Sequence, residues 1–331
     1  MERKLWCVCE NICAAKIALL HLSAALALAA LIAPRMAGAN TIIVDSAGSG
    51  QATAIQVGIS LASTGDTVRV LAGTSGVYDE AVVLERDVTL ECEGPDLVKI
   101  RNNSGDTVTV NTGRTVAIRG CTITGAGVGI MIKQGVSADI ANNVLWGNAK
   151  GASRDPGHAV GTIVVRNNVI TGSSGDGLSL TTSCCSCGYG DVSKLIINNI
   201  VSNNSLCGLN VCSSGGLLDI EYNNSVGNNP NYCGNGTAGV GSISAAPGFM
   251  SEGTGDFRLS SNSTSRNVGK PGYTDPDGTR NDLGAYGGPD AAGFFPSPES
   301  GPTIRMMSIF PSSVPKNGTI TLQATGQVAV P

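Results

Sequence analysis

Histidine, tryptophan and charged residues are all scarce in this chain of 331 residues. Charged residues make up 14% of the chain and aromatic residues 4%, and the net charge of −4 gives no electrostatic reason to expect a nucleic-acid partner. Of the two histidines, only His158 lies beyond the first 39 residues. A metal site built from several histidines is therefore excluded there, and a Ser-His-Asp triad is disfavoured.

Glycine, in contrast, is abundant, with 45 residues. The chain has too little charge for a disordered protein, and it lacks the long amphipathic patterns of a helical bundle. Many short strands separated by turns rich in Gly, Asn and Ser would produce this composition. The composition therefore predicts an all-β protein.

The first 39 residues have the features of a signal peptide. Arg3, Lys4 and Lys16 precede an apolar run at 17–33, Pro34 interrupts it, and Ala-Gly-Ala at 37–39 offers a cleavage site before Asn40. An uncleaved membrane anchor is the alternative, since the run approaches the length of a span. No later segment is apolar enough to cross a bilayer, so we expect a secreted or cell-surface protein without a membrane span after cleavage.

One pattern recurs five times after residue 115, as apolar residues, a polar pair usually containing Asn, and further apolar residues. The segments are 116–124, 138–146, 163–171, 195–203 and 218–226, and their polar positions are Cys121, Asn143, Asn168, Asn199 and Asn223. A second marker, a glycine followed by an apolar residue, keeps the same phase at Gly129, Gly177 and Gly208, with a degenerate copy near Gly151. The loops of an antiparallel sandwich would not hold two markers in phase, so the repeat favours a solenoid of stacked parallel coils at 93–245. The asparagines are then expected to form a ladder along one corner.

Residues 40–92 are expected to cap this solenoid and form its first coil. The segment 41–45 has the pattern of a strand, 54–62 that of a short amphipathic helix, and 67–71 that of a second strand. An open solenoid end exposes core and unpaired strand edges, which a short helix can cover.

Two stretches carry a family resemblance. Ile55-Gln56, the run Gly65-Asp66-Thr67-Val68, the segment 76–80 and Val88-Thr89-Leu90 resemble the start of bacterial pectin-lyase-like proteins, and 248–289 resembles their closing segment. The resemblance implies a right-handed parallel β-helix with a C-terminal closing segment at 246–290. The chain departs from the resemblance at 263–269, where it reads STSRNVG, so the resemblance does not predict the closing turn there. Beyond it, 291–302 is a Pro/Ser/Gly linker, and 303–331 is a β-rich tail similar to the opening of an Ig-like module.

Eight of the 11 cysteines follow the signal region, and an even number in an exported chain favours disulfides. Aligning Gly177, Gly208 and Gly234 places Cys207 and Cys233 on adjacent coils, which makes them the best candidate pair. Cys212 is expected to bond within the inserted loop that holds Cys184, Cys185 and Cys187, and Cys92 can pair with Cys121 if a bulge brings them into phase. A thiolate metal site in the loop is the alternative, although its cysteine spacing is not that of a zinc site.

No assembled catalytic centre is apparent from the sequence. A polysaccharide lyase needs a basic residue to remove a proton, for which Lys133, Arg166 and Lys194 are candidates. A hydrolase needs acidic residues on neighbouring coils, and Asp176 is a weak candidate that fits a turn equally well. Asp275, Asp277 and Asp282 in DPDGTRND could bind Ca²⁺ but fit no complete calcium loop, and we expect no other cofactor.

The sequence therefore predicts a secreted or cell-surface β-helix that acts as a binding or scaffold module, with polysaccharide as its candidate partner. The alternative is a polysaccharide lyase or glycoside hydrolase whose site lies in the variable loops. The sequence leaves the oligomeric state open.

Overall fold

The computed structural model describes residues 39–156, 161–181, 192–213, 216–295, 303–310 and 321–327. The proposed signal peptide up to residue 38, His158, the loop cysteines 184, 185 and 187, and residues 296–302 of the linker lie outside these residues. No helix in the described ranges is long and apolar enough to cross a membrane.

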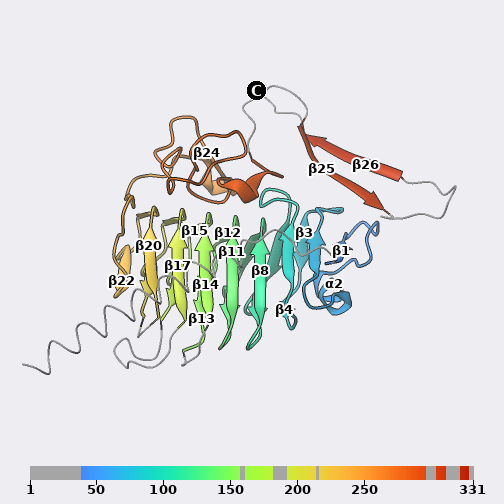
Figure 1. The fold of residues 1–331 in the computed structure, drawn as a ribbon, viewed down its shortest axis with the longest axis horizontal. Helices are drawn as coiled ribbons and strands as arrows, with labels where there is room; N and C mark the ends of the chain where they lie inside the picture. Colours follow the sequence, from blue (N-terminus) through green and yellow to red (C-terminus); the bar gives the residue numbers. More distant parts are fainter. Residues whose placement is uncertain are drawn as a thin grey trace, which may run out of the picture.

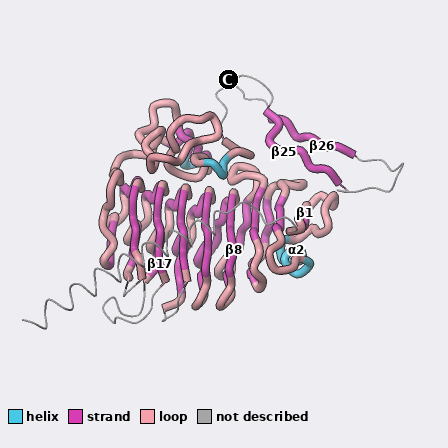
Figure 2. The backbone as a smooth tube through the Cα atoms, viewed as in Figure 1, coloured by secondary structure: helices cyan, strands magenta, loops and turns pink. Residues whose placement is uncertain are grey.

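The chain winds into a solenoid of three parallel sheets, here called sheets A, B and C (Figures 1 and 2). Each coil adds one strand to sheet A, then one to B, then one to C, after which the chain returns to sheet A. Sheet A contains β1 (Thr41–Val44), β2 (Thr67–Val70), β5 (Thr89–Cys92), β8 (Thr115–Arg119), β11 (Ser137–Ala141), β14 (Thr162–Arg166), β17 (Ser193–Ile197) and β20 (Leu218–Glu221). Sheet B contains β3 (Val77–Asp79), β6 (Lys99–Asn102), β9 (Thr122–Gly125), β12 (Val144–Trp146), β15 (Val169–Thr171), β18 (Ile200–Ser202) and β21 (Asn224–Val226). Sheet C contains β4 (Val82–Leu84), β7 (Val108–Val110), β10 (Val128–Ile132), β13 (Lys150–Arg154), β16 (Leu178–Leu180), β19 (Leu209–Val211) and β22 (Tyr232–Gly234).

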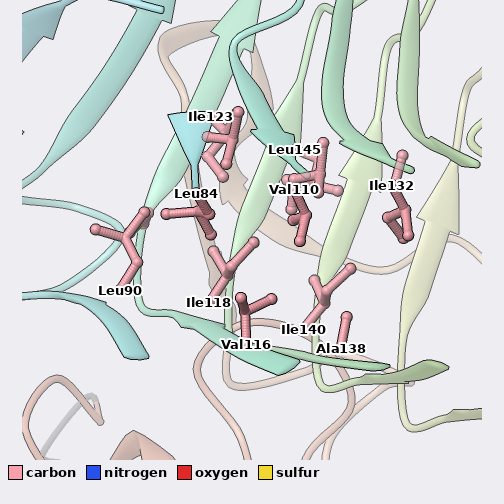
Figure 3. Packing of buried hydrophobic residues seen from close by; sticks show 14 of the residues in the cluster. Leu84, Leu90, Val110, Val116, Ile118, Ile123, Ile132, Ala138, Ile140 and Leu145 are labelled. Carbon is pink, nitrogen blue, oxygen red and sulfur yellow. The ribbon is translucent and has the colours of Figure 1, made fainter. Parts of the chain in front are cut away.

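The core lies inside the solenoid, where every second side chain of each strand points. Ile118 and Ile140 from sheet A, Ile123 from sheet B, and Leu84 and Val110 from sheet C are essentially inaccessible and face one another (Figure 3). Parallel register stacks like residues on like, so apolar rows run along the axis. A coil on its own could not bury this surface, which is why the repeat specifies a stack. The predicted all-β parallel solenoid is confirmed.

The corner between sheets A and B holds the predicted asparagine ladder. The Asn168 backbone N–H donates to Asn199 Oδ1 at 2.9 Å, and the Asn168 Nδ2 donates to the carbonyls of Ile140 and Arg166 at 2.8 and 2.9 Å. The same arrangement repeats at Asn143 and Asn199, whose N–H groups donate to the next asparagine. The asparagine side chains of the ladder are therefore buried, and their amide groups are hydrogen-bonded.

A second asparagine row lies beside the marker glycines Gly177 and Gly208. Asn204 lies at the corner between sheets B and C, where its Nδ2 donates to the Ile170 carbonyl and to Asn228 Oδ1. A Cβ atom at Gly177 would lie 2.7 Å from Asn204 Nδ2, and one at Gly208 would lie 2.6 Å from Asn228 Nδ2. At Gly177 and Gly208 the neighbouring coil's amide therefore occupies the space of a side chain, whereas at Gly151 the Ile170 side chain and the Gly177 carbonyl occupy it.

The helix α2 (Ile55–Leu61) covers the N-terminal end of the solenoid, as the sequence predicts (Figure 1). Ile55 and Ile59 are buried against the first coil. Glu80 accepts hydrogen bonds from the N–H groups of Ile55 and Gln56, which satisfies two donors at the start of the helix. This helix and the strand β1 thus close the first coil.

The closing segment packs on the outer face of sheet B, alongside the corner with sheet A (Figure 1). It contains β23 (Phe249–Ser251), η1 (Glu252–Thr254), β24 (Asp256–Leu259) and η2 (Pro289–Ala291). Phe257 and Leu283 bury the outward side chains of Val144, Val169 and Ile200. Two further strands, β25 (Thr303–Phe310) and β26 (Thr321–Gln327), form an antiparallel hairpin in the tail.

The two predicted cysteine pairs form disulfides. Cys207 bonds Cys233 across a Cα separation of 6.0 Å, and Cys92 bonds Cys121 across 5.1 Å. The register expected for Cys233 is wrong, because it stands opposite Asn210 rather than Cys207. Cys121 comes within reach of Cys92 through a turn at Gly120, whose φ is 67°, and not through a bulge. Cys212 is also disulfide-bonded.

Candidate functional site on the outer face of sheet C

The four side chains predicted as catalytic candidates do not come together. Lys133 and Asp176 lie on the outer face of sheet C, Arg166 lies on the outer face of sheet A, and Lys194 points into the solenoid. Lys194 stands in register with the inward-facing Ile163, its exposed fraction is 1%, and its Nζ donates to the Val192 carbonyl at 3.2 Å. A lysine in this position has no access to a polymer outside the solenoid.

Arg166 ties the closing segment to sheet A. It donates to Asp139 from Nε at 2.9 Å and from an NH group at 2.8 Å, and it forms an ion pair with Asp290 of η2. Burial opposes its charge, but the two carboxylates outweigh burial and raise the pKa of Arg166. Burial likewise opposes ionisation of Asp290, but the guanidinium groups of Arg166 and Arg119 lower its pKa. Arg166 therefore stays charged and paired, which makes it a structural residue and not an accessible base.

On sheet C, alternation places Met131, Ser153, Ser179 and Asn210 in one row on the outer face, since Ser153 stands opposite Met131 and Ser179, and Ser179 opposite Asn210. Lys133 and Asp155 continue this face beyond the ends of β10 and β13. Lys133 Nζ lies 3.2 Å from Asp155 Oδ2, and both side chains are about one-third exposed, at 34% each. This ion pair borders the row on the side that leads to sheet A.

A second ion pair borders the row on the side that comes from sheet B. Lys150 Nζ lies 3.9 Å from Asp176 Oδ2 and 3.4 Å from Ser179 Oγ. Asp176 is nearly buried, and its carboxylate accepts hydrogen bonds from the Cys207 N–H at 3.2 Å and from Asn210 Nδ2 at 3.0 Å. Lys150 remains 40% exposed. Four successive coils, those of β10, β13, β16 and β19, therefore build one polar cluster on an otherwise regular sheet.

We define the sheet C site as Lys133, Asp155, Lys150, Asp176, Ser153, Ser179 and Asn210. Its two ammonium groups are the exposed part, since Lys133 and Lys150 are 34% and 40% exposed. Ser153 and Ser179 are nearly buried, at 7% and 4%, and Asn210 Nδ2 is bonded to Asp176. The exposed ammonium groups can donate hydrogen bonds to the hydroxyls or the carboxylates of a polysaccharide.

The connections from sheet C back to sheet A become longer beside this site. They span 111–114 and 133–136 in the earlier coils, but 155–161 and 181–192 after β13 and β16. Binding residues are commonly carried by such loops on a rigid scaffold. His158 and the cysteines 184, 185 and 187 belong to these two connections and lie outside the described residues.

Most of the sheet C site was missed from the sequence, although a signal for it exists. Three of the four marker glycines are followed two positions later by a polar residue, which gives Ser153 after Gly151, Ser179 after Gly177 and Asn210 after Gly208, whereas Gly129 is followed by Met131. A polar residue at that offset marks the outward face of a sheet C strand.

The aspartates predicted as Ca²⁺ ligands shape the closing segment instead. Asp275 accepts hydrogen bonds from the N–H groups of Gly288 and Asp282 at 2.6 and 2.9 Å, and Asp277 accepts from Thr279 at 2.9 Å. Asp282 accepts from the Asn267 N–H at 2.7 Å. Within the described ranges, no three acidic, histidine or cysteine side chains form a group that could hold a metal ion.

The tryptophan Trp146 also serves the closing segment. Its ring packs edge-on against Phe257, with centroids 5.5 Å apart, and Lys99 Nζ lies over it at 5.6 Å. The ring is therefore engaged by side chains of the protein itself and offers no free platform for a sugar.

A protein-family model matches more than half of the chain. A family model described as the right handed beta helix region matches residues 57–230, which run from α2 into the last coil and include every residue of the sheet C site. A search of curated proteins found no matching relative.

Proposed function

Because the chain belongs to the right-handed β-helix family, we propose that it is a polysaccharide-binding module that uses the sheet C site. One observation supports this function above the others: two partly exposed lysines, each paired with an aspartate, lie at opposite borders of one outer face across successive coils. Coils in a parallel sheet are spaced by about 4.8 Å, so a chain extended along the coil axis would pass over several coils of this face. A repeating polymer is the kind of ligand that such a surface fits.

Binding fits this site better than hydrolysis. Each carboxylate is already paired with a lysine, and Asp176 also accepts two hydrogen bonds. A glycosidase needs one carboxyl group held protonated and a second that acts on the opposite face of the sugar. Asp155 and Asp176 are each engaged by a lysine, so neither is free to contact a sugar ring in this arrangement.

A uronate lyase is the second candidate function, and one observation favours it. Lys133 and Lys150 reach the same outer face, from opposite borders of the row. One lysine could neutralise the uronate carboxylate while the other removed the adjacent proton, as the chemistry requires. The base would first have to leave its aspartate partner.

The test combines binding with product detection. Affinity electrophoresis would use the purified protein with polygalacturonate and, separately, a neutral glucan in the gel. We expect retardation in at least one gel and a loss of affinity of about tenfold, equivalent to about 1.4 kcal/mol, in Lys150→Met. The matched control is Arg101→Met, which removes an exposed cation paired with Asp79 on sheet B. Equal affinities for both variants would exclude the sheet C site.

Product detection separates the module from the lyase. A lyase releases unsaturated uronides that absorb ultraviolet light, and this signal would disappear in Lys133→Met or Lys150→Met. Binding without product supports the module, whereas a product signal lost in both variants would replace it with the lyase.

We also propose that the protein acts outside the cytoplasm. Disulfides form and persist in oxidising compartments, and two pairs are present in the described residues. Protease protection of the chain in intact cells, compared with cells opened by detergent, would test its location.

A further inference from the structure

The two hydrogen-bond donors that hold Asp176 lie on one short segment, 207–210, which a disulfide ties to the next coil. One donor is the backbone N–H of Cys207 itself, 3.2 Å from Asp176 Oδ1. The other is Asn210 Nδ2, 3.0 Å from Asp176 Oδ2, and Asn210 stands in register with Cys233. The Cys207–Cys233 bond thus fastens the segment that positions this carboxylate to the strand β22.

We propose that the Cys207–Cys233 disulfide is a positioning element of the sheet C site, so that high-affinity binding requires the oxidised protein. This inference rests on the proposed polysaccharide-binding function. Asp176 in turn places Lys150, so the effect of the disulfide reaches the exposed ammonium group through Asp176.

The position of the bond in the solenoid supplies the reason. β22 is the terminal strand of sheet C and pairs only with β19, whereas β16 and β19 each have neighbours on both sides. A terminal strand opens more easily than an internal one, and opening exposes the residues next to it. The bond fastens β22 to the turn before β19, where Cys207 donates to Asp176.

The second disulfide provides a matched control. Cys92–Cys121 also joins neighbouring coils, and its sequence separation of 29 residues is close to the 26 of Cys207–Cys233. Loop entropy therefore predicts a similar contribution to stability from both bonds. Cys92 ends β5 of sheet A, and Cys121 lies at the corner between sheets A and B, so neither contacts the sheet C site.

Loss of the bond can be produced chemically as well as by substitution. A dithiol such as dithiothreitol donates two electrons and two protons, the sulfur–sulfur bond breaks, two cysteine thiols form, and the reagent becomes a cyclic disulfide. The reagent also opens Cys92–Cys121 and the bond of Cys212, so the reduced and oxidised proteins are compared beside the C92S/C121S variant. This comparison does not depend on whether C207S/C233S folds.

The experiment measures affinity for the polysaccharide that retards the wild-type protein. We expect C207S/C233S to bind about tenfold more weakly, while C92S/C121S keeps the wild-type affinity well below the unfolding temperature of each variant. A double-mutant cycle with Asp176→Asn then separates positioning from general stability. Because both changes act through the same carboxylate, the combined variant is expected to lose about tenfold, the same as either change alone.

Two outcomes would overturn the positioning role. One is an unchanged affinity in C207S/C233S, and the other is a combined loss of about a hundredfold, which would show that the disulfide and Asp176 act independently. If the wild-type protein binds no polysaccharide, the proposed function fails, and hydrogen exchange still tests the geometry. Amide exchange in the peptide that spans 206–211 should accelerate on removal of Cys207–Cys233 and not on removal of Cys92–Cys121, and equal exchange would contradict the inference.

Discussion

Replacing Asn168 with alanine tests the ladder that sets the spacing of the coils. The side chain of Asn168 lies at the corner between sheets A and B and is fully buried. Its Nδ2 donates to the carbonyls of Ile140 and Arg166 and to Asn199 Oδ1, and its Oδ1 accepts from the Asn143 N–H. Alanine would remove all of these bonds and leave three backbone groups without this partner.

The expected loss of stability follows from those three groups. A buried backbone group deprived of its partner costs about 1 to 3 kcal/mol, and partial relaxation places the total for Asn168→Ala at about 3 to 5 kcal/mol. Asn168→Asp should be at least as destabilising, because its carboxylate keeps the acceptor but loses the donor and faces two carbonyls. Urea denaturation followed by far-ultraviolet circular dichroism gives the free energy of unfolding.

The control is an asparagine that makes similar bonds in water. Asn235 is exposed, accepts a hydrogen bond from the Ser213 N–H and donates to the Ser213 carbonyl, each at 3.0 Å. Asn235→Ala should cost less than about 1 kcal/mol, since water replaces both partners. If Asn168→Ala lowered the free energy of unfolding by no more than this control does, the ladder would not stabilise the stack as described.

Three further substitutions test the closing segment, its pH dependence and the second corner. Arg166→Ala leaves Asp139 buried with one cation fewer and should destabilise the protein by about 3 to 5 kcal/mol, with faster proteolysis of 249–295 as the direct readout. Burial and neighbouring carboxylates raise the pKa of Asp275 to about 6, so the folded chain holds a proton that the unfolded chain releases near pH 4. The free energy of unfolding should therefore fall by on the order of 2 kcal/mol as the pH rises from about 4 to 6, and level off above. Thermal melts of Asp275→Asn should show a weaker fall over the same range. Gly177→Ala should cost about 1 to 3 kcal/mol, since its Cβ would lie 2.7 Å from Asn204 Nδ2 and 2.8 Å from the Gly208 carbonyl oxygen. Gly253→Ala meets nothing within 4 Å and should be near neutral in the same denaturation assay.

The fold could be predicted from the sequence because each coil repeats the same physical requirement. One asparagine in each coil from Asn143 to Asn223 bonds the backbone at the A–B corner, and Gly177 and Gly208 make room for the neighbouring coil's amide at the B–C corner. Both requirements are local in the coil, so they leave marks at recurring positions. The cap helix could be predicted for the same reason, since its apolar residues have their own period.

The site was harder to predict, because it depends on side-chain direction and exact register. Lys194 follows the long connection 181–192, so the sequence does not fix the residue at which β17 begins. A shift of one residue in the strand decides whether the Lys194 side chain points inward or outward. Cys233 was aligned through Gly234, but the last coil places Cys233 opposite Asn210. The contacts of Arg166 with Asp290 join residues 124 positions apart, a relation that no repeat encodes.

Hydrogen–deuterium exchange with and without bound polysaccharide tests the central claim most directly. The account predicts that polymer slows exchange in peptides covering β13, β16 and β19 and the connections beside them, while peptides from β8 and β11 on sheet A are unaffected. Protection confined to sheet A or to the closing segment, with sheet C unchanged, would contradict the assignment of binding to the sheet C site.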